Sequence, residues 1–137
     1  MQAKTKARGR RINQQQMAAA SLRAFEQISS NWDLSVKDQL RLLGDPPRST
    51  FLAWHSNPEK AMLSQDTLER LSNIVAIYKS LQLLFTEPKR ADEWIRKPNT
   101  APLFGSRSAL DRMLAGNVGD LDLVRRYLYT VRGGGWS

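Results

Sequence analysis

The sequence of 137 residues contains no cysteine and only one histidine, His55. The lack of cysteine excludes disulfides, thiolate metal sites and cysteine nucleophiles, and it is typical of proteins in reducing compartments. A lone histidine with no second ligand donor beside it favours neither a metal site nor a catalytic base. These absences predict a cytoplasmic protein that uses no metal and no cofactor.

No segment is long and apolar enough to cross a membrane. The most apolar run, residues 74–85, includes Lys79, Ser80 and Gln82 and is shorter than the ~20 residues that a membrane helix needs. The basic first residues lead into a glutamine-rich stretch, which does not resemble a secretory signal. No segment alternates apolar and polar residues over a useful length, so no strand is predicted. The sequence therefore indicates an all-α protein without a membrane segment.

Residue groupings that carry out catalysis are missing as well. No glycine-rich loop follows a strand, and the GGG near the end has no helix after it to hold a phosphate. The neighbouring acids, Asp92 with Glu93 and Asp120 with Asp122, lie on short helices or at a turn, where capping accounts for them. We therefore expect no enzymatic activity and no small-molecule substrate.

What is present is a repeated helical pattern. Apolar residues three and four positions apart predict about seven helices, near residues 17–31, 35–43, 47–56, 64–85, 88–95, 108–115 and 120–132. Ser35 with Asp38, and Ser108 with Asp111, have the spacing of capping boxes, and Ser64 is expected to cap the longest helix.

The long helix predicted at residues 64–85 carries a broad apolar stripe. The stripe contains Leu68, Leu71, Ile74, Val75, Ile77, Tyr78, Leu81, Leu84 and Phe85. So broad a stripe predicts burial on two sides, either by a second layer of helices or by a second subunit. We expect a homodimer on this ground.

The chain is basic, with a formal net charge of +8. Its first residues include five cations and no acid, namely Lys4, Lys6, Arg8, Arg10 and Arg11. Such a tail favours a polyanionic partner, although it is equally typical of a solvated chain end. We divide the chain into an irregular basic tail at 1–16, a DNA-binding and dimerisation domain at 17–87 and a C-terminal domain at 88–137.

Residues 35–56 read as helix, tight glycine turn and helix, which suits a helix-turn-helix unit whose second helix enters the major groove. The exposed start of that second helix would carry Arg48, Ser49 and Thr50. Arg48 is the best candidate for a guanine contact because its forked donors match the two guanine acceptors. Lys37, Arg41 and Lys60 flank the unit and are candidates for phosphate contacts. The residues expected to hold the second helix onto its neighbours are Phe51, Leu52 and Trp54.

A second candidate surface lies in the C-terminal third, where two prolines interrupt the helical spacing. Prolines reduce the freedom lost on docking, so the loop is expected to present Leu103 and Phe104 outward at little ordering cost. Trp94, Phe104 and Trp136 are of the residue types that anchor interfaces. In the alternative interpretation, Trp94 and Leu103 close the small C-terminal core. We hypothesise that the end of the chain, with Trp136, enters a cleft of a partner protein.

WIRKPNTAPLFGSRSALDRMLAG followed by LDLVRRYLYTVRGG resembles the C-terminal toxin-binding domain of the Xre/ParS/MbcA antitoxin family. The matching positions are Trp94, Pro98, Asn99, Phe104, Gly105, Leu110, Met113, Gly116, Leu128, Arg132 and Gly133. The upstream part is similar to the Xre-type DNA-binding domain of that family, in LLG, Thr50, Trp54 and LSQDTLERL. Two departures concern the loop, since the family often has a second Gly where Phe104 stands and a Pro near Ala109.

The resemblance implies an antitoxin whose partner is a RES-domain toxin, an enzyme that consumes NAD or transfers its ADP-ribose. Such antitoxins bind beside or over the toxin's NAD entrance, and also bind the operator of their own operon, usually as dimers. Two recognition helices of a dimer would lie about one DNA turn, ~34 Å, apart. Together with the loop argument, this gives the toxin-binding candidates Trp94, Pro98, Asn99, Leu103, Phe104, Arg132 and Trp136.

Two other functions are compatible with the composition. In a stand-alone transcription regulator, the C-terminal helices would only dimerise. A basic RNA-associated protein would bind with strong salt dependence and without sequence preference, whereas a repressor prefers one operator.

Overall fold

The computed structural model describes the backbone of residues 2–133 and the side chains of residue 9 and residues 13–133. Seven α-helices and one 3₁₀ turn follow one another in this part of the chain: α1 (Gln2–Asn31), α2 (Val36–Leu42), α3 (Arg48–Ser56), η1 (Pro58–Lys60), α4 (Gln65–Leu84), α5 (Pro88–Trp94), α6 (Ala109–Met113) and α7 (Val118–Arg132). Among these residues, pairing of the β type is limited to one isolated bridge between Pro98 and Ser108. The predicted all-α fold is confirmed.

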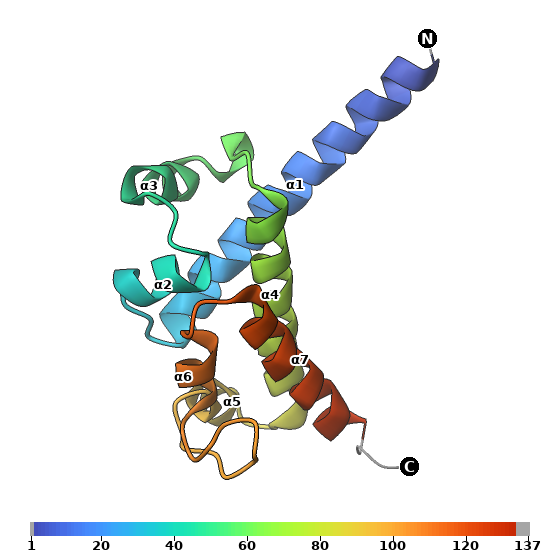
Figure 1. Cartoon of the computed structure of the whole chain (residues 1–137). Coiled ribbons are helices and arrows are strands. Elements are labelled where there is room, and N and C mark those ends of the chain that lie inside the picture. Colours follow the sequence, from blue (N-terminus) through green and yellow to red (C-terminus); the bar gives the residue numbers. More distant parts are fainter. Residues whose placement is uncertain (1, 134–137) are drawn as a thin grey trace.

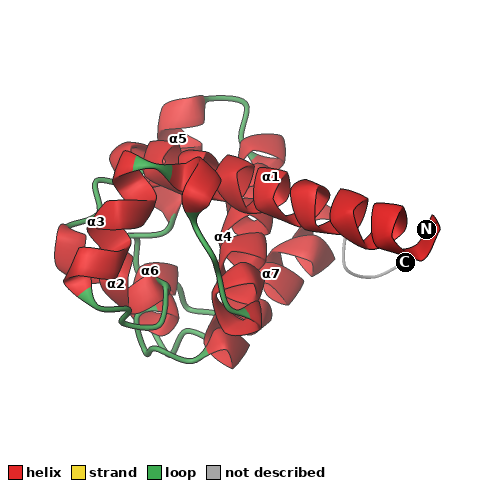
Figure 2. Ribbon diagram, turned by 90° about the horizontal axis from the view of Figure 1, so that it is seen from above, coloured by secondary structure: helices red, strands yellow, loops and turns green. Residues whose placement is uncertain are grey.

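Helix α4 is the centre of the molecule. α1 packs along one side of it and α7 along another, and α2 and α3 lie on the opposite side from α7 (Figures 1 and 2). Its apolar stripe is sealed, since Leu71, Ile74, Ile77 and Leu81 are fully buried. Burying each such side chain contributes roughly 1.5–3 kcal/mol to the free energy of folding. A second layer of helices therefore covers most of the broad stripe.

Helix α1 begins earlier than the sequence predicts. The periodic apolar positions indicate a helix from residue 17, whereas α1 begins at Gln2 and includes the segment expected to be irregular. Figure 1 shows this first part of α1 projecting away from the rest of the molecule. Residues 2–16 are rich in Ala, Gln, Lys and Arg, which are good helix formers, and extending an existing helix avoids the cost of nucleation. Apolar periodicity cannot detect a helix in a segment whose only large apolar residue is Ile12.

The predicted caps are present at three helix starts. Ser64 accepts from the amide of Thr67, and Ser108 with Asp111 forms a complete capping box. At α2, Ser35 accepts from the amide of Asp38 at 3.1 Å without a return bond from the Asp38 side chain. These caps fix where α4, α6 and α2 begin, and so the spacing of the loops between them.

Candidate functional site

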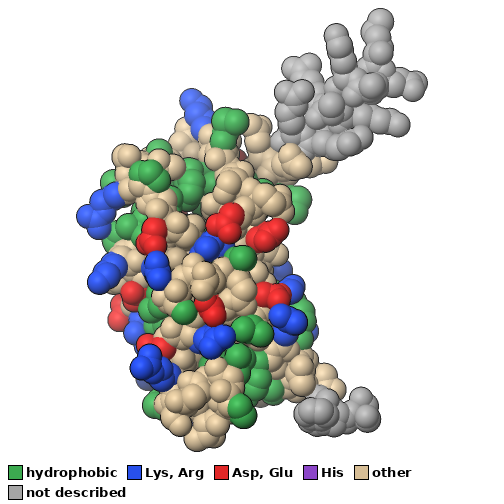
Figure 3. Space-filling model, viewed as in Figure 1, with side chains coloured by type: hydrophobic (Ala, Val, Ile, Leu, Met, Phe, Trp, Pro, Cys, Tyr) green, Lys and Arg blue, Asp and Glu red, His purple; other side chains and the backbone are tan. Residues whose placement is uncertain are grey.

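Helices α2 and α3 form the predicted helix-turn-helix unit. The turn between them passes through Gly44 and Asp45, both with positive φ, and α3 begins at Arg48 directly after Pro47. No side chain caps this helix, so its first amides are free to bind an anion or solvent. Arg48 and Ser49 are exposed there and Thr50 is half-buried. Figure 3 shows Lys and Arg side chains along the edge of the molecule formed by α2 and α3.

The inner face of α3 holds it on α1. Phe51 and Trp54 are buried in the core beside Leu22 and Phe25 of α1, as predicted. Leu52 differs from the prediction: it is 53% exposed, because it lies on the face of α3 turned away from α1. α3 thus has a buried side that fixes it and an outer side that is open.

His55 links α3 to α1 by a polar contact. Its Nε2 lies 3.2 Å from Oε1 of Glu26, and its ring lies 6.2 Å from that of Phe51. No group of three or more metal-ligating side chains is found in the described part of the chain. His55 therefore adds a half-exposed polar contact to the packing of α3 on α1.

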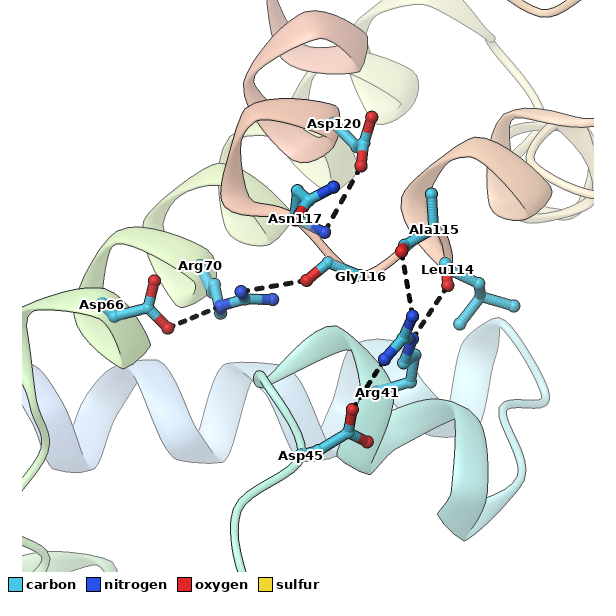
Figure 4. Close-up of polar contacts among 9 residues, drawn as sticks. All are labelled: Arg41, Asp45, Asp66, Arg70, Leu114, Ala115, Gly116, Asn117 and Asp120. Atoms are coloured by element: carbon cyan, nitrogen blue, oxygen red, sulfur yellow. Dashed lines mark hydrogen bonds and ion pairs between the residues drawn. The ribbon is translucent and has the colours of Figure 1, made fainter.

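Arg41, a candidate phosphate contact, has its donors occupied within the protein. Its Nε and Nη2 donate to the carbonyls of Leu114 (3.1 Å) and Ala115 (2.9 Å), and its Nη1 pairs with Asp45 at 2.8 Å (Figure 4). The side chain therefore ties α2 to the loop between α6 and α7. By contrast, Lys37 and Lys60 are exposed and make no ion pair among the described residues.

Arg70 of α4 reaches the same loop. It is buried, pairs with Asp66 at 2.7 Å through Nε, and donates from Nη2 to the carbonyl of Gly116 at 3.0 Å (Figure 4). Gly116 has a φ of 102°, and a Cβ at this position would lie 2.5 Å from the Arg41 guanidinium. Such a close approach of backbone to guanidinium requires glycine here.

A third arginine makes a similar connection, to the backbone that follows the C-terminal end of α1. Arg96, just after α5, donates from Nη2 to the carbonyls of Trp32 and Asp33, both at 2.8 Å. These carbonyls follow the last turn of α1 and have no helical partner. Arg41, Arg70 and Arg96 therefore join the N-terminal and C-terminal helices through charge-assisted hydrogen bonds to backbone.

The predicted loop between α5 and α6 is folded around Asn99. The amide of Asn99 donates to the carbonyl of Arg107 at 3.0 Å, and its Oδ1 accepts from the amide of Ala101 at 2.9 Å. Pro98 is exposed beside it. Asn99 shapes this surface from within, and Pro98 is available for contact.

Phe104 is buried, and the prediction that the loop presents it outward is wrong. Its ring meets those of Trp94 (6.0 Å) and Tyr127 (5.1 Å) edge to face, and Trp94 stacks on Tyr127 at 6.4 Å. Such arrangements are favourable for aromatic rings. Trp94 and Leu103 are half-buried at the rim of this cluster, which agrees with the interpretation that they close the small C-terminal core.

Arg132 lies at the end of α7 with its guanidinium over the ring of Tyr129, 5.3 Å from the centroid. It also donates to Oγ of Ser80 at 3.1 Å. Nearby on α7, a hydrogen bond from Arg125 holds the pKa of Asp122 below its ordinary value. Trp136 lies outside the described residues, as do the side chains of Lys4, Lys6, Arg8, Arg10 and Arg11.

Within the described part of the chain, no helix is long and apolar enough to span a membrane.

Two families of domains match the chain in tandem. Residues 11–76 match the antitoxin Xre-like helix-turn-helix domain, and residues 80–134 match the antitoxin Xre/MbcA/ParS C-terminal toxin-binding domain. The chain is also 50% identical over 115 residues to the uncharacterized protein y4oB of Sinorhizobium fredii (strain NBRC 101917 / NGR234), an alignment that covers 84% of this chain and 86% of the relative. With a helix-turn-helix unit and a toxin-binding domain packed on one central helix, this chain belongs to the Xre/MbcA/ParS family of antitoxins.

Proposed function

We propose that this antitoxin neutralises a RES-domain toxin, an enzyme that consumes NAD or transfers its ADP-ribose, by covering the toxin's active site. We further propose that it represses its own operon by binding operator DNA as a homodimer. The observation that carries the proposal is the tandem match to a helix-turn-helix domain and a toxin-binding domain. The RES assignment rests on the resemblance of the segment from Trp94 to Gly133 to antitoxins of that class.

The operator surface is the outer side of α2 and α3. Arg48 and Ser49 stand at the uncapped start of α3, and Lys37 and Lys60 are exposed on either side. Phosphate contacts by the lysines would set affinity, and Arg48 at a base edge would set specificity.

The toxin surface is the rim of the C-terminal aromatic cluster together with the end of α7. Pro98, the exposed parts of Trp94 and Leu103, and Arg132 form it, while Asn99 and Phe104 shape it from beneath. The role of Trp136 stays a prediction from the sequence.

Co-expression with the toxin encoded beside the antitoxin gene tests the proposal. We expect the antitoxin to restore growth and cellular NAD. In parallel, Arg48→Ala should weaken binding to the operon's own promoter about tenfold or more, since a bidentate guanine contact carries ~1–3 kcal/mol. Lys97→Ala, exposed far from α3, is the matched control. NAD that stays depleted in the presence of the antitoxin would refute neutralisation, a toxin that changes neither NAD nor ADP-ribosylation when expressed alone would refute the RES assignment, and equal binding to unrelated DNA would refute the repressor.

A further inference from the structure

A groove of about 760 Å³ remains open on the third side of α4, between α1 and α7. It is lined by Met17 of α1, by Leu68, Val75, Ala76 and Leu83 of α4, and by Tyr129 of α7. Met17 and Leu83 are 68% and 69% exposed, which is unusual for large apolar side chains that line one concavity. The described residues leave this surface without a covering element.

The two ends of the groove are complementary to each other. At the start of α4 lie Leu68 and the acidic Glu69, with Met17 beside them. At the end of α4 lie Leu83 and the basic Lys79, and α7 adds a second cation there because Arg132 bonds Ser80. Glu69 and Lys79 make no ion pair among the described residues. One end is therefore acidic and apolar, and the other is basic and apolar.

We propose that a second copy of this chain fills the groove, with the two α4 helices antiparallel. The two-fold axis crosses α4 at the height of Ile74, whose own side chain faces the core. A two-fold contact needs a surface that is complementary to itself when reversed, and this stripe has that property. Residues equally distant from Ile74 then meet, so Glu69 faces the partner's Lys79. In the same register Leu83 faces the partner's Gln65 and lies within one helical turn of the partner's Leu68, at the end of the groove that Met17 also lines.

The centre of the stripe suits a close helix crossing. Ser72 and Ala76 lie two positions on either side of Ile74, and both line the groove. Small side chains at a crossing let two helices approach closely, which brings the flanking apolar residues into contact. α4 has 20 residues and is ~30 Å long, so both the central and the terminal contacts fall within one helix pair.

This inference deepens the proposed homodimer and rests on that part of the proposed function alone. Its test is sedimentation equilibrium of the full chain with charge-reversed variants. Glu69→Lys and Lys79→Glu should each raise the dimer dissociation constant about tenfold, since each change acts twice in a two-fold dimer and replaces attraction by repulsion. The double variant restores opposite charges and should return the constant close to the wild-type value. Glu87→Lys, exposed and outside the groove, is the matched control.

Leu83→Asp gives a second readout. It should make the chain monomeric in the same measurement, because it puts a carboxylate into the apolar end of the groove. A wild-type chain that stays monomeric, a double variant that is not rescued, or a Leu83→Asp chain that still dimerises would overturn the proposal. A rescued dimer that shows no operator preference would leave this interface standing and would refute only the repressor.

Discussion

Arg41 stands on the helix-turn-helix unit, yet its guanidinium is bonded to two carbonyls of the α6–α7 loop. We therefore expect Arg41→Ala to destabilise the fold by about 1 kcal/mol through the lost hydrogen bonds, and to leave the salt dependence of operator binding unchanged. Lys37→Ala, on the same helix, should reduce the slope of log affinity against log salt by about one, because it removes one phosphate contact. Urea denaturation and a salt series of fluorescence anisotropy measure the two effects. An equal loss of slope in both variants would place Arg41 on the DNA.

Side-chain hydrogen bonds to residues nearby in the chain can be predicted from the sequence, whereas those to residues far away in the chain cannot. The caps at Ser64 and Ser108 follow from spacing alone, because their partners lie three residues on. Arg41, Arg70 and Arg96 bond backbone carbonyls 46 to 74 positions away, and a backbone carbonyl leaves no signal in the sequence. The charge of Arg41 and its place on α2 alone therefore predict a DNA contact, whereas its partners in the structure are backbone carbonyls.

At the scale of elements, the α5–α6 loop shows why a loop rich in proline need not be an open surface. Phe104 packs against Tyr127, which belongs to α7 and therefore lies outside the loop and its prolines. Phe104→Ala should therefore cost about 3–5 kcal/mol of stability, as other large core truncations do. Leu103→Ala, at the half-buried rim, should lower the free energy of unfolding less than Phe104→Ala does. Relative to that loss of stability, it should weaken toxin binding more. Thermal unfolding and calorimetric titration of the toxin compare the two, and a destabilised Leu103→Ala that binds normally would contradict the proposed surface.

The sequence predicts the helices themselves better than it predicts which elements pack against each of them. Periodicity predicts α2 to α7 because each buries one face, and it misses the first half of α1 because Ile12 is the only large apolar residue in residues 2–16. The broad stripe of α4 predicted two-sided burial, but it could not tell helices of the same chain from a second subunit. In the structure α1 and α7 take two sides of α4, and one side stays open.

For the whole molecule, the arginine contacts imply that the DNA-binding and toxin-binding halves unfold together. Gly116 tests this, since a Cβ there would displace the Arg41 guanidinium and also meet a φ of 102°. Gly116→Ala should lower stability by about 2 kcal/mol. Gly105→Ala is the matched control, because it has a positive φ of 55° and open space around it, so it carries only the backbone cost.

The double variant Arg41→Ala/Gly116→Ala separates strain from contact. If the new Cβ acts by expelling Arg41, the Gly116→Ala penalty should shrink toward that of Gly105→Ala once Arg41 is absent, because no guanidinium remains to be displaced. Urea denaturation followed by Trp fluorescence and by circular dichroism measures it, and the wild-type chain should show one transition by both probes. Strictly additive penalties would mean that the loop is held by its own backbone, and that α2 can move independently of the toxin-binding helices.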